Sequence, residues 1–164
     1  MIFVTVGTQL PFDRLIRAVD KWCAQSDLGG ESFAQIGRAE AGTYRPEHIS
    51  WAETIRPAEF QERVQAARVI VSHAGMGSII TAMRFGKPIV IVPRRAALGE
   101  HRNDHQLATV KWLGNRPGIY PVLDEAELPA QVQQILESGA AGGAVPAFAE
   151  DRLIETLRGF IHEG

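Results

Sequence analysis

The sequence predicts an α/β fold, a doubly wound domain around a mainly parallel β-sheet. Short apolar, β-branched runs alternate with longer segments in which apolar residues recur at helical spacing. Glycine and proline stand at many of the boundaries between them, as expected where helices end. The 164 residues suffice for one domain with its own core and are too few for two of ordinary size, so a single domain over 1–164 is expected. An apolar content of 45% and a charged content of 22% fit a folded globular chain.

The first half of the sequence contains three expected strands and two expected helices. Residues 2–6 are apolar and β-branched and predict the first strand. Apolar side chains in 12–23 recur on one face at helical spacing, which predicts an amphipathic helix. Residues 32–36 and 48–51 predict two weaker strands separated by a polar loop. Pro57 stands where a second helix can begin, because proline fits the first helical turn.

The second half repeats the alternation. Residues 68–72 predict a buried strand, and a helix follows Gly75 and ends at Gly86. Residues 138–147 predict a flexible connector to an amphipathic C-terminal helix over 149–161. The remaining expected elements are strands at 88–92 and 119–123, a helix that ends near Gly114, and a helix that contains Leu128, Val132, Ile135 and Leu136.

Charge, cysteine content and hydropathy narrow the functional classes. Seventeen basic and nineteen acidic residues give a net charge of −2, which offers no electrostatic reason to bind nucleic acid or to adsorb to membranes. Cys23 is the single cysteine and lies on an apolar helical stripe, so core packing and a reducing cytoplasm are expected. No apolar run approaches the roughly 20 residues of a membrane span, and no signal peptide is recognisable. A cytoplasmic chain is expected, unless a partner recruits it to a membrane.

Three segments that follow expected strands are predicted to meet at one edge of the sheet. In open parallel sheets, ligands bind beyond the carboxyl ends of the strands. The segments are the loop Gly7-Thr8-Gln9, residues 73–78 and residues 94–106. For the loop of Gly7, Thr8 and Gln9, contact with a ligand and plain turn chemistry are equally compatible with the residues.

The segment His-Ala-Gly-Met-Gly-Ser has features of an anion site. Gly75, Met76, Gly77 and Ser78 open an expected helix directly after a strand, and the free amides of a helix N-terminus favour phosphate. The glycines allow close approach of a ligand, and the serine adds a hydroxyl donor. A plain strand-to-helix turn is the alternative, because the segment matches neither a Walker A loop nor a complete Gly-x-Gly-x-x-Gly motif.

Residues 100–106, Glu-His-Arg-Asn-Asp-His-Gln, are dense in polar side chains. Such a cluster can hydrogen-bond sugar hydroxyls, a ribose or a diphosphate. A solvated helix start with Asn103 or Asp104 as N-cap is an alternative. A metal site is another, because His101 and His105 are four residues apart, but no third ligand is marked.

Two motifs together carry a family resemblance. SHAGMGSIITAMRFGKPIVIVPR over 72–94, followed by GEHRNDHQ over 99–106, resembles the donor-sugar-binding domain of glycosyltransferase family 28. The opening MIFVTVGTQLPFDRLI over 1–16 resembles the small single-domain subunits of bacterial exopolysaccharide and capsule glycosyltransferases. The eukaryotic counterpart of these subunits is the catalytic subunit of the enzyme that adds the second N-acetylglucosamine to dolichol diphosphate. The resemblance runs over nearly the whole chain.

The resemblance implies one Rossmann-like domain, equal to the donor half of a two-domain GT-B glycosyltransferase. By position, residues 75–78 would bind the donor diphosphate, and the backbone around Ile55 and Arg56 would lie near the uracil. Residues 7–9 would face the acceptor half, which would be a separate, membrane-anchored chain. The residues implied near the donor sugar and ribose are Glu100, His101, Asn103, His105 and Gln106.

One position departs from the family pattern. Many relatives have a carboxylate three residues after the serine of the glycine motif, where it grips the ribose hydroxyls, and this chain has Thr81 there. Either Glu100 supplies a carboxylate from the neighbouring loop, or the ribose is held more weakly. Arg94, Arg95 and Arg102 either favour an acidic sugar such as glucuronate or are surface arginines.

The implied chemistry needs neither a metal nor another cofactor. UDP gains negative charge as the glycosidic bond breaks, and the amides of Gly77 and Ser78 would stabilise that charge. Inversion at the anomeric carbon needs a base to deprotonate the acceptor hydroxyl. Thr8 and Gln9 offer none, and His73 is only a candidate, so the base is expected from the partner.

The function expected is that of a donor-binding, catalytic subunit of a UDP-sugar-dependent inverting glycosyltransferase. It would transfer a hexosyl or hexuronosyl residue to a lipid-linked acceptor in exopolysaccharide biosynthesis, at the inner face of the cell membrane. Two alternatives remain open: a non-catalytic nucleotide-sugar-binding regulatory module, and a self-sufficient enzyme formed by two identical chains. The donor sugar and the acceptor are left open by the sequence.

Overall fold

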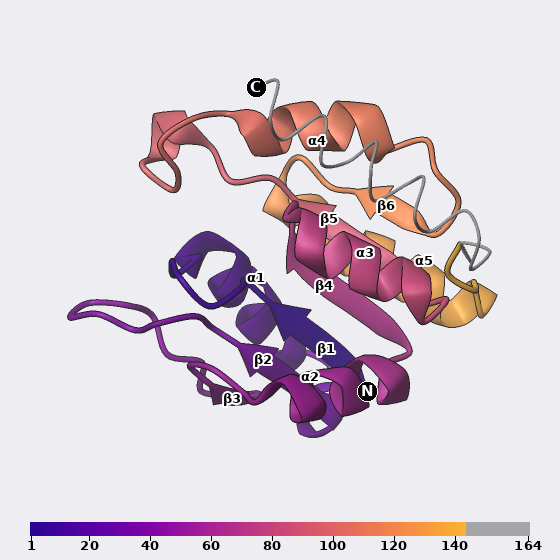
Figure 1. Cartoon of the computed structure of the whole chain (residues 1–164). Coiled ribbons are helices and arrows are strands. Elements are labelled where there is room, and N and C mark those ends of the chain that lie inside the picture. The colour runs from indigo at the N-terminus through magenta and orange to yellow at the C-terminus, as the bar shows by residue number, and fades with distance from the viewer. Residues whose placement is uncertain (144–164) are drawn as a thin grey trace.

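The computed structural model describes residues 1–143, which form a six-stranded sheet with helices on both faces (Figure 1). All neighbouring strands are parallel, in the order β3-β2-β1-β4-β5-β6. This confirms the predicted doubly wound α/β architecture. The strands are β1 (Ile2–Thr5), β2 (Ser32–Gln35), β3 (Ser50–Ala52), β4 (Val69–His73), β5 (Ile89–Val92) and β6 (Ile119–Pro121).

Within the described residues, five α-helices connect or follow these strands. The predicted Pro57 start of α2 is confirmed, and Gly86 follows the end of α3 with a φ of 59° that favours glycine. None of the helices in residues 1–143 combines the length and apolar character that a membrane span requires. The helices are α1 (Asp13–Ala24), α2 (Pro57–Ala66), α3 (Met76–Arg84), α4 (His105–Leu113) and α5 (Leu128–Ser138), with short 3₁₀ turns η1 (Gly29–Glu31), η2 (Ala96–Leu98) and η3 (Glu125–Glu127).

Each face of the sheet has its own hydrophobic core. On β1, Val4 packs in the core beneath α1 and α5, whereas Phe3 packs in the core beneath α2, α3 and α4. The same alternation runs through β4 and β5, because successive side chains of a strand point to opposite faces. Figure 1 shows α2 and α3 in front of the sheet and α1 and α5 behind it. Cys23 lies in the α1 core with 3% of its surface exposed.

The winding direction of the chain changes beside β1. From β1 the chain winds outward through β2 and β3, returns to the other side of β1, and winds outward again through β4, β5 and β6. The loops after β1 and β4 therefore leave the sheet toward opposite sides. In doubly wound sheets, this switch point opens a crevice at the carboxyl ends of the strands.

The segment after α5 returns to the opposite, amino-terminal edge of the sheet. Gly139 ends α5 with a φ of 62°, and the Gly142 amide donates to the Gly86 carbonyl over 3.0 Å. A Cβ on Gly142 would lie 2.2 Å from the Lys87 carbonyl carbon, so only glycine fits this backbone contact. The remainder of the connector expected over 138–147 and the helix expected over 149–161 lie outside the described residues.

A buried carboxylate fixes the long connection between β2 and β3. Asp20 of α1 is fully buried and accepts hydrogen bonds from the Tyr44 hydroxyl at 2.7 Å and from the His48 amide at 2.8 Å. It also accepts one from the Glu47 amide at 3.0 Å. Burial by itself would raise the pKa of Asp20, but these donors hold the pKa below its ordinary value.

We expect Asp20→Asn to lower the free energy of unfolding by about 2 kcal/mol, because the charge-assisted hydrogen bonds are lost. The folded-state pKa lies below the unfolded one, so this stabilisation is complete above about pH 4 and is lost as the pH falls through the folded pKa. Urea unfolding between pH 3 and pH 7 measures both effects. The exposed Asp27→Asn change is the control. Equal stability of wild type and Asp20→Asn at pH 7 would contradict this role.

Candidate functional site

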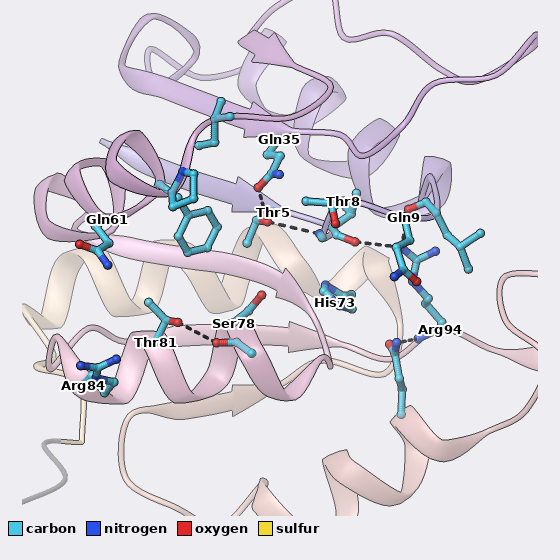
Figure 2. A pocket seen from close by; sticks show the side chains of 18 of the residues that line it. Thr5, Thr8, Gln9, Gln35, Gln61, His73, Ser78, Thr81, Arg84 and Arg94 are labelled. Carbon is cyan, nitrogen blue, oxygen red and sulfur yellow. Dashed lines mark hydrogen bonds between the residues drawn. The ribbon is translucent and has the colours of Figure 1, made fainter. Parts of the chain in front are cut away.

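A cavity of about 750 Å³ opens at the switch point, beyond the ends of β1 and β4 (Figure 2). Its walls come from the loop after β1, the end of β2, the start of α2, the cavity-facing side of α3 and the segment after β5. The three predicted segments do meet here, since each contributes residues to the wall. None of the described residues that line the cavity is an aspartate or a glutamate.

The first loop lines the cavity with Gly7, Thr8 and Gln9. Gly7 has a φ of 81°, and a Cβ there would lie 3.3 Å from the His73 ring. Glycine therefore satisfies both the left-handed backbone and the close approach of the imidazole.

Arg94 fixes the first loop through hydrogen bonds to its main chain. Its guanidinium donates to the carbonyls of Val6 at 3.1 Å, Leu10 at 2.8 Å and Pro11 at 2.6 Å, and the residue is only 2% exposed. Burial lowers the pKa of Arg94 to about 10. Although Arg94 contributes to the cavity wall, its guanidinium donates to main-chain carbonyls. It is neither a surface arginine nor a side chain directed at an acidic sugar, the two alternatives that the sequence suggested.

The N-terminus of α3 presents unpaired amides to the cavity. Gly77 and Ser78 line the wall, and no side chain caps the helix. The amides of the first helical turn have no partner within the helix, so they are available to an anion. A Cβ on Gly77 would meet nothing within 4 Å, which leaves space for a ligand beside the backbone.

Two other residues of the glycine motif support the site without lining it. A Cβ on Gly75 would lie 2.1 Å from Nε2 of His73, so glycine makes room for the imidazole. Met76 begins α3 and packs against the core beneath α2, α3 and α4. The structure therefore brings only the second half of the predicted phosphate motif to the cavity.

His73 is a neutral imidazole in the cavity wall. Burial, and then the charge of Arg94, lower the pKa of His73 to about 4. The Ser72 hydroxyl donates to the Thr5 carbonyl at 3.0 Å and lies 3.3 Å from Nδ1 of His73. The hydroxyl hydrogen is thereby used, so Nδ1 is assigned as a donor to Ser72 and Nε2 is left as an acceptor.

The segment after β5 divides between the cavity and the scaffold. His101 and Gln106 line the cavity. Glu100 does not: its two carboxylate oxygens accept from Arg14 at 2.7 and 2.9 Å, and one also accepts from the Arg95 amide at 2.9 Å. The structure therefore gives Glu100 a scaffold contact with Arg14 of α1, outside the lining of the cavity.

The other polar side chains of this segment form local hydrogen bonds around the start of α4. Asn103 Oδ1 lies 3.1 Å from His101 Nδ1 and accepts from the His105 amide at 3.4 Å, and neither Asn103 nor His105 lines the cavity. Asp104 occupies the N-cap position, but its carboxylate accepts from the Ala96 amide. Within residues 1–143, no three His, Cys, Asp or Glu side chains gather closely enough to hold a metal ion.

Several cavity residues carry no motif in the sequence. Of the two residues expected near the uracil, Ile55 lines the cavity, whereas Arg56 lies outside it at the start of α2. The Thr81 hydroxyl donates to the Gly77 carbonyl of its own helix at 2.8 Å. Some of the other lining residues lie three, four or seven positions after Pro57 or Ser78, on the same helix faces, so helical spacing could have indicated them. The lining residues that sequence reasoning missed as site residues are Thr5, Val6, Leu10, Gln35, Pro57, Phe60, Gln61, Arg84 and Phe85.

Comparison with solved structures places the fold among glycosyltransferases. The NMR solution structure of ALG13 superposes with a TM-score of 0.60 at 17% identity and covers 93% of each chain. The crystal structure of the glycosyltransferase of kitacinnamycin superposes with a TM-score of 0.56 at 21% identity. It covers 99% of this chain, which spans 39% of that enzyme.

Sequence comparison identifies the family. The human UDP-N-acetylglucosamine transferase subunit ALG13 (Homo sapiens) is 36% identical over 121 residues, which cover 68% of this chain and 10% of the human protein. The chain thus spans about a tenth of the length of that relative. The model of the glycosyltransferase family 28 C-terminal domain matches residues 1–147, which confirms the resemblance drawn from the motifs. The chain therefore belongs to the glycosyltransferase family 28 C-terminal domain family.

Proposed function

We propose that this chain is the donor-binding subunit of an inverting glycosyltransferase that uses a UDP-sugar. The observation that carries the proposal is the uncapped N-terminus of α3, where Gly77 and Ser78 face a cavity whose described lining includes no carboxylate. Such a wall does not repel a diphosphate, and a helix N-terminus attracts one. The membership of glycosyltransferase family 28 supports this assignment.

The proposed donor pose follows the walls of the cavity. The diphosphate binds the amides of Gly77 and Ser78 together with the Ser78 hydroxyl, which stabilise the charge on departing UDP without a metal. The nucleobase lies against the apolar side near Ile55. The donor sugar lies toward His101 and Gln106. Of the other residues implied near the sugar by resemblance, Glu100, Asn103 and His105 stand outside the lining and are not part of this pose.

The catalytic base belongs to a partner in this proposal. No described residue of the wall is a carboxylate, and burial holds the pKa of His73 at about 4, so its imidazole is a poor proton acceptor at neutral pH. The partner is a membrane-anchored, acceptor-binding subunit that recruits the chain to the cytoplasmic face. The acceptor is lipid-linked and the product belongs to exopolysaccharide biosynthesis, with a hexosyl or hexuronosyl residue transferred.

Exposed leucines mark the edge at which this partner docks. Leu10, Leu98 and Leu123 are 46%, 56% and 50% exposed and follow the carboxyl ends of β1, β5 and β6. Arg94 holds the Leu10 carbonyl, and Arg95 donates to the Leu123 carbonyl, so both loops are fixed in place. Apolar side chains on fixed loops around an incomplete site suit a second protein chain.

We expect the double change Leu98→Asp and Leu123→Asp to abolish partner-dependent sugar transfer while UDP affinity stays within about twofold, because neither leucine lines the cavity. Transfer assays with partner-containing membranes and calorimetry with UDP measure the two effects. The double change Gln133→Asp and Gln134→Asp adds the same two charges to exposed sites on α5 and is the control. Full transfer by the double variant would count against this docking edge.

Calorimetry of the purified chain with a panel of UDP-sugars tests the proposal, with and without the partner. UDP-N-acetylglucosamine is the first donor to test, because the human relative is a subunit of a transferase for that sugar. UDP-glucose, UDP-galactose and UDP-glucuronate complete the panel. Absence of binding under both conditions would eliminate the proposed function.

The cavity without a carboxylate base also favours a second candidate, a nucleotide-sugar-binding module that regulates a synthase without transferring sugar. Transfer that is lost on Ser78→Trp in a reconstituted mixture supports the enzyme, and transfer that survives it supports the regulator. Transfer by the purified chain alone to a soluble acceptor would instead indicate a self-sufficient homo-oligomer.

A further inference from the structure

Gln35 ends β2 with an amide that is buried yet faces the cavity. The residue is 2% exposed and lines the cavity wall. Its Oε1 accepts a hydrogen bond from the Thr5 hydroxyl over 3.1 Å, as Figure 2 shows. No motif marks this position in the sequence, and the proposed donor pose does not use it.

The neighbouring hydrogen bonds fix which end of the amide faces inward. The Gly7 amide donates to Thr5 Oγ1 at 3.3 Å, so the Thr5 hydroxyl acts as an acceptor there and directs its own hydrogen to Gln35 Oε1. This arrangement assigns Oε1 of Gln35 to the Thr5 side and Nε2 to the other side. Among residues 1–143, no group accepts a hydrogen bond from this Nε2.

The unpartnered Nε2 of Gln35 can donate a hydrogen bond to an oxygen atom of a ligand. Buried polar groups are almost always hydrogen-bonded, and Nε2 is not among the fully enclosed unpaired atoms of the described chain, so it remains open to the cavity. Nε2 carries two hydrogens and no lone pair for bonding, so it recognises an acceptor. Because the amide is neutral, it suits a neutral carbonyl oxygen. The charged diphosphate binds instead at the N-terminus of α3, whose dipole favours an anion.

Apolar residues beside Gln35 define the shape of that ligand group. Gln35 pairs with Ala52 across the sheet, and the chain then continues from β3 to Ile55, Pro57 and Phe60, all in the same wall. A flat ring can lie against these side chains with a carbonyl edge toward the amide. A pyrimidine base has such an edge, and UDP carries one.

We propose that Gln35 reads a carbonyl oxygen of the pyrimidine base of the donor and that Thr5 positions its amide for this purpose. The proposal rests on the proposed function, since it assigns the nucleobase contact of the same site. Gln35 is thus a specificity-determining residue for the nucleotide, separate from the diphosphate contacts of Gly77 and Ser78.

The test compares UDP with inorganic pyrophosphate, which lacks the base. Gln35→Glu keeps an acceptor for Thr5 and removes both donors, and Gln35→Met removes the amide while keeping the length of the side chain. Both variants are expected to bind UDP about 10- to 100-fold more weakly than wild type, with pyrophosphate affinity within about twofold. Gln65→Met is the matched control on an exposed glutamine of α2 that does not line the cavity, with UDP binding expected within about threefold.

The outcomes separate this inference from the proposed function. Loss of CDP affinity equal to that of UDP supports contact with O2 of the base, and loss for UDP alone supports contact with O4, since cytosine has an amino group there. Unchanged UDP affinity in both variants, an equal loss of pyrophosphate binding, or an equal loss in Gln65→Met would overturn the inference. A wild-type chain that binds neither UDP nor pyrophosphate would overturn the proposed function itself. Thermal melting identifies a variant that fails to fold, and the other Gln35 variant then decides the result.

Discussion

Replacing Ser78 by tryptophan is expected to weaken UDP binding by about 100-fold or more, equal to about 2.8 kcal/mol or more. Ser78 stands in the first turn of α3 and lines the cavity, so an indole there fills the volume proposed for the diphosphate and covers the free amides. The fold is expected to survive, because the side chain enters the cavity and does not belong to either hydrophobic core.

Two milder changes on the same helix calibrate this result. Ser78→Ala removes one hydroxyl donor and is expected to cost about tenfold in UDP affinity. Thr81→Ala is expected to cost less, because the Thr81 hydroxyl already donates to the Gly77 carbonyl. Calorimetry measures the affinities, and thermal melting shows whether each variant is folded. A folded Ser78→Trp variant with wild-type affinity would exclude the α3 N-terminus as the diphosphate site.

Replacing Arg94 by methionine is expected to lower the free energy of unfolding by about 3–5 kcal/mol, the range for breaking a buried charged contact. The change leaves three main-chain carbonyls, those of Val6, Leu10 and Pro11, without their donor. It also frees the loop of Gly7, Thr8 and Gln9, so UDP binding is expected to weaken even where the variant remains folded.

The Arg94 prediction is tested by urea unfolding and by calorimetry at low temperature. Arg102→Met is the control, because Arg102 is an exposed arginine on the same segment after β5. Arg94→Lys is expected to recover only part of the stability, since one ammonium group cannot replace the planar fork that reaches three carbonyls. A loss below about 1 kcal/mol in Arg94→Met would show that the loop holds itself in place.

The predictable part of this structure is the part encoded locally. The helical stripe of 12–23 and the apolar run of 69–71 specify their elements through neighbouring residues, and both are present in α1 and β4. The site edge was predictable for the same reason, because the carboxyl ends of parallel strands share one edge. The third strand begins at Ser50, two residues later than expected, where the pattern is short.

The roles that were not predictable depend on contacts between distant residues. Glu100 and Arg14 are 86 positions apart, so nothing near Glu100 shows that its carboxylate is engaged. Arg94 likewise reaches a carbonyl 88 positions earlier in the chain. Gln35 gains its importance only when Thr5 lies beside it in the sheet. In each case a polar side chain is assigned by tertiary packing, which local pattern does not record.

The Arg14 contacts have a consequence for the rigidity of the cavity. Arg14 belongs to α1, in the half that winds from β1 toward β3, and it bridges Glu100 and Glu125 in the half that ends with β6. It also donates to the Pro93 carbonyl at 2.9 Å. Arg14 therefore joins the two halves across the switch point, as Arg94 does from the other half. The cavity at the switch point is therefore preorganised, so a ligand that binds there orders little of the protein and loses little affinity to conformational entropy.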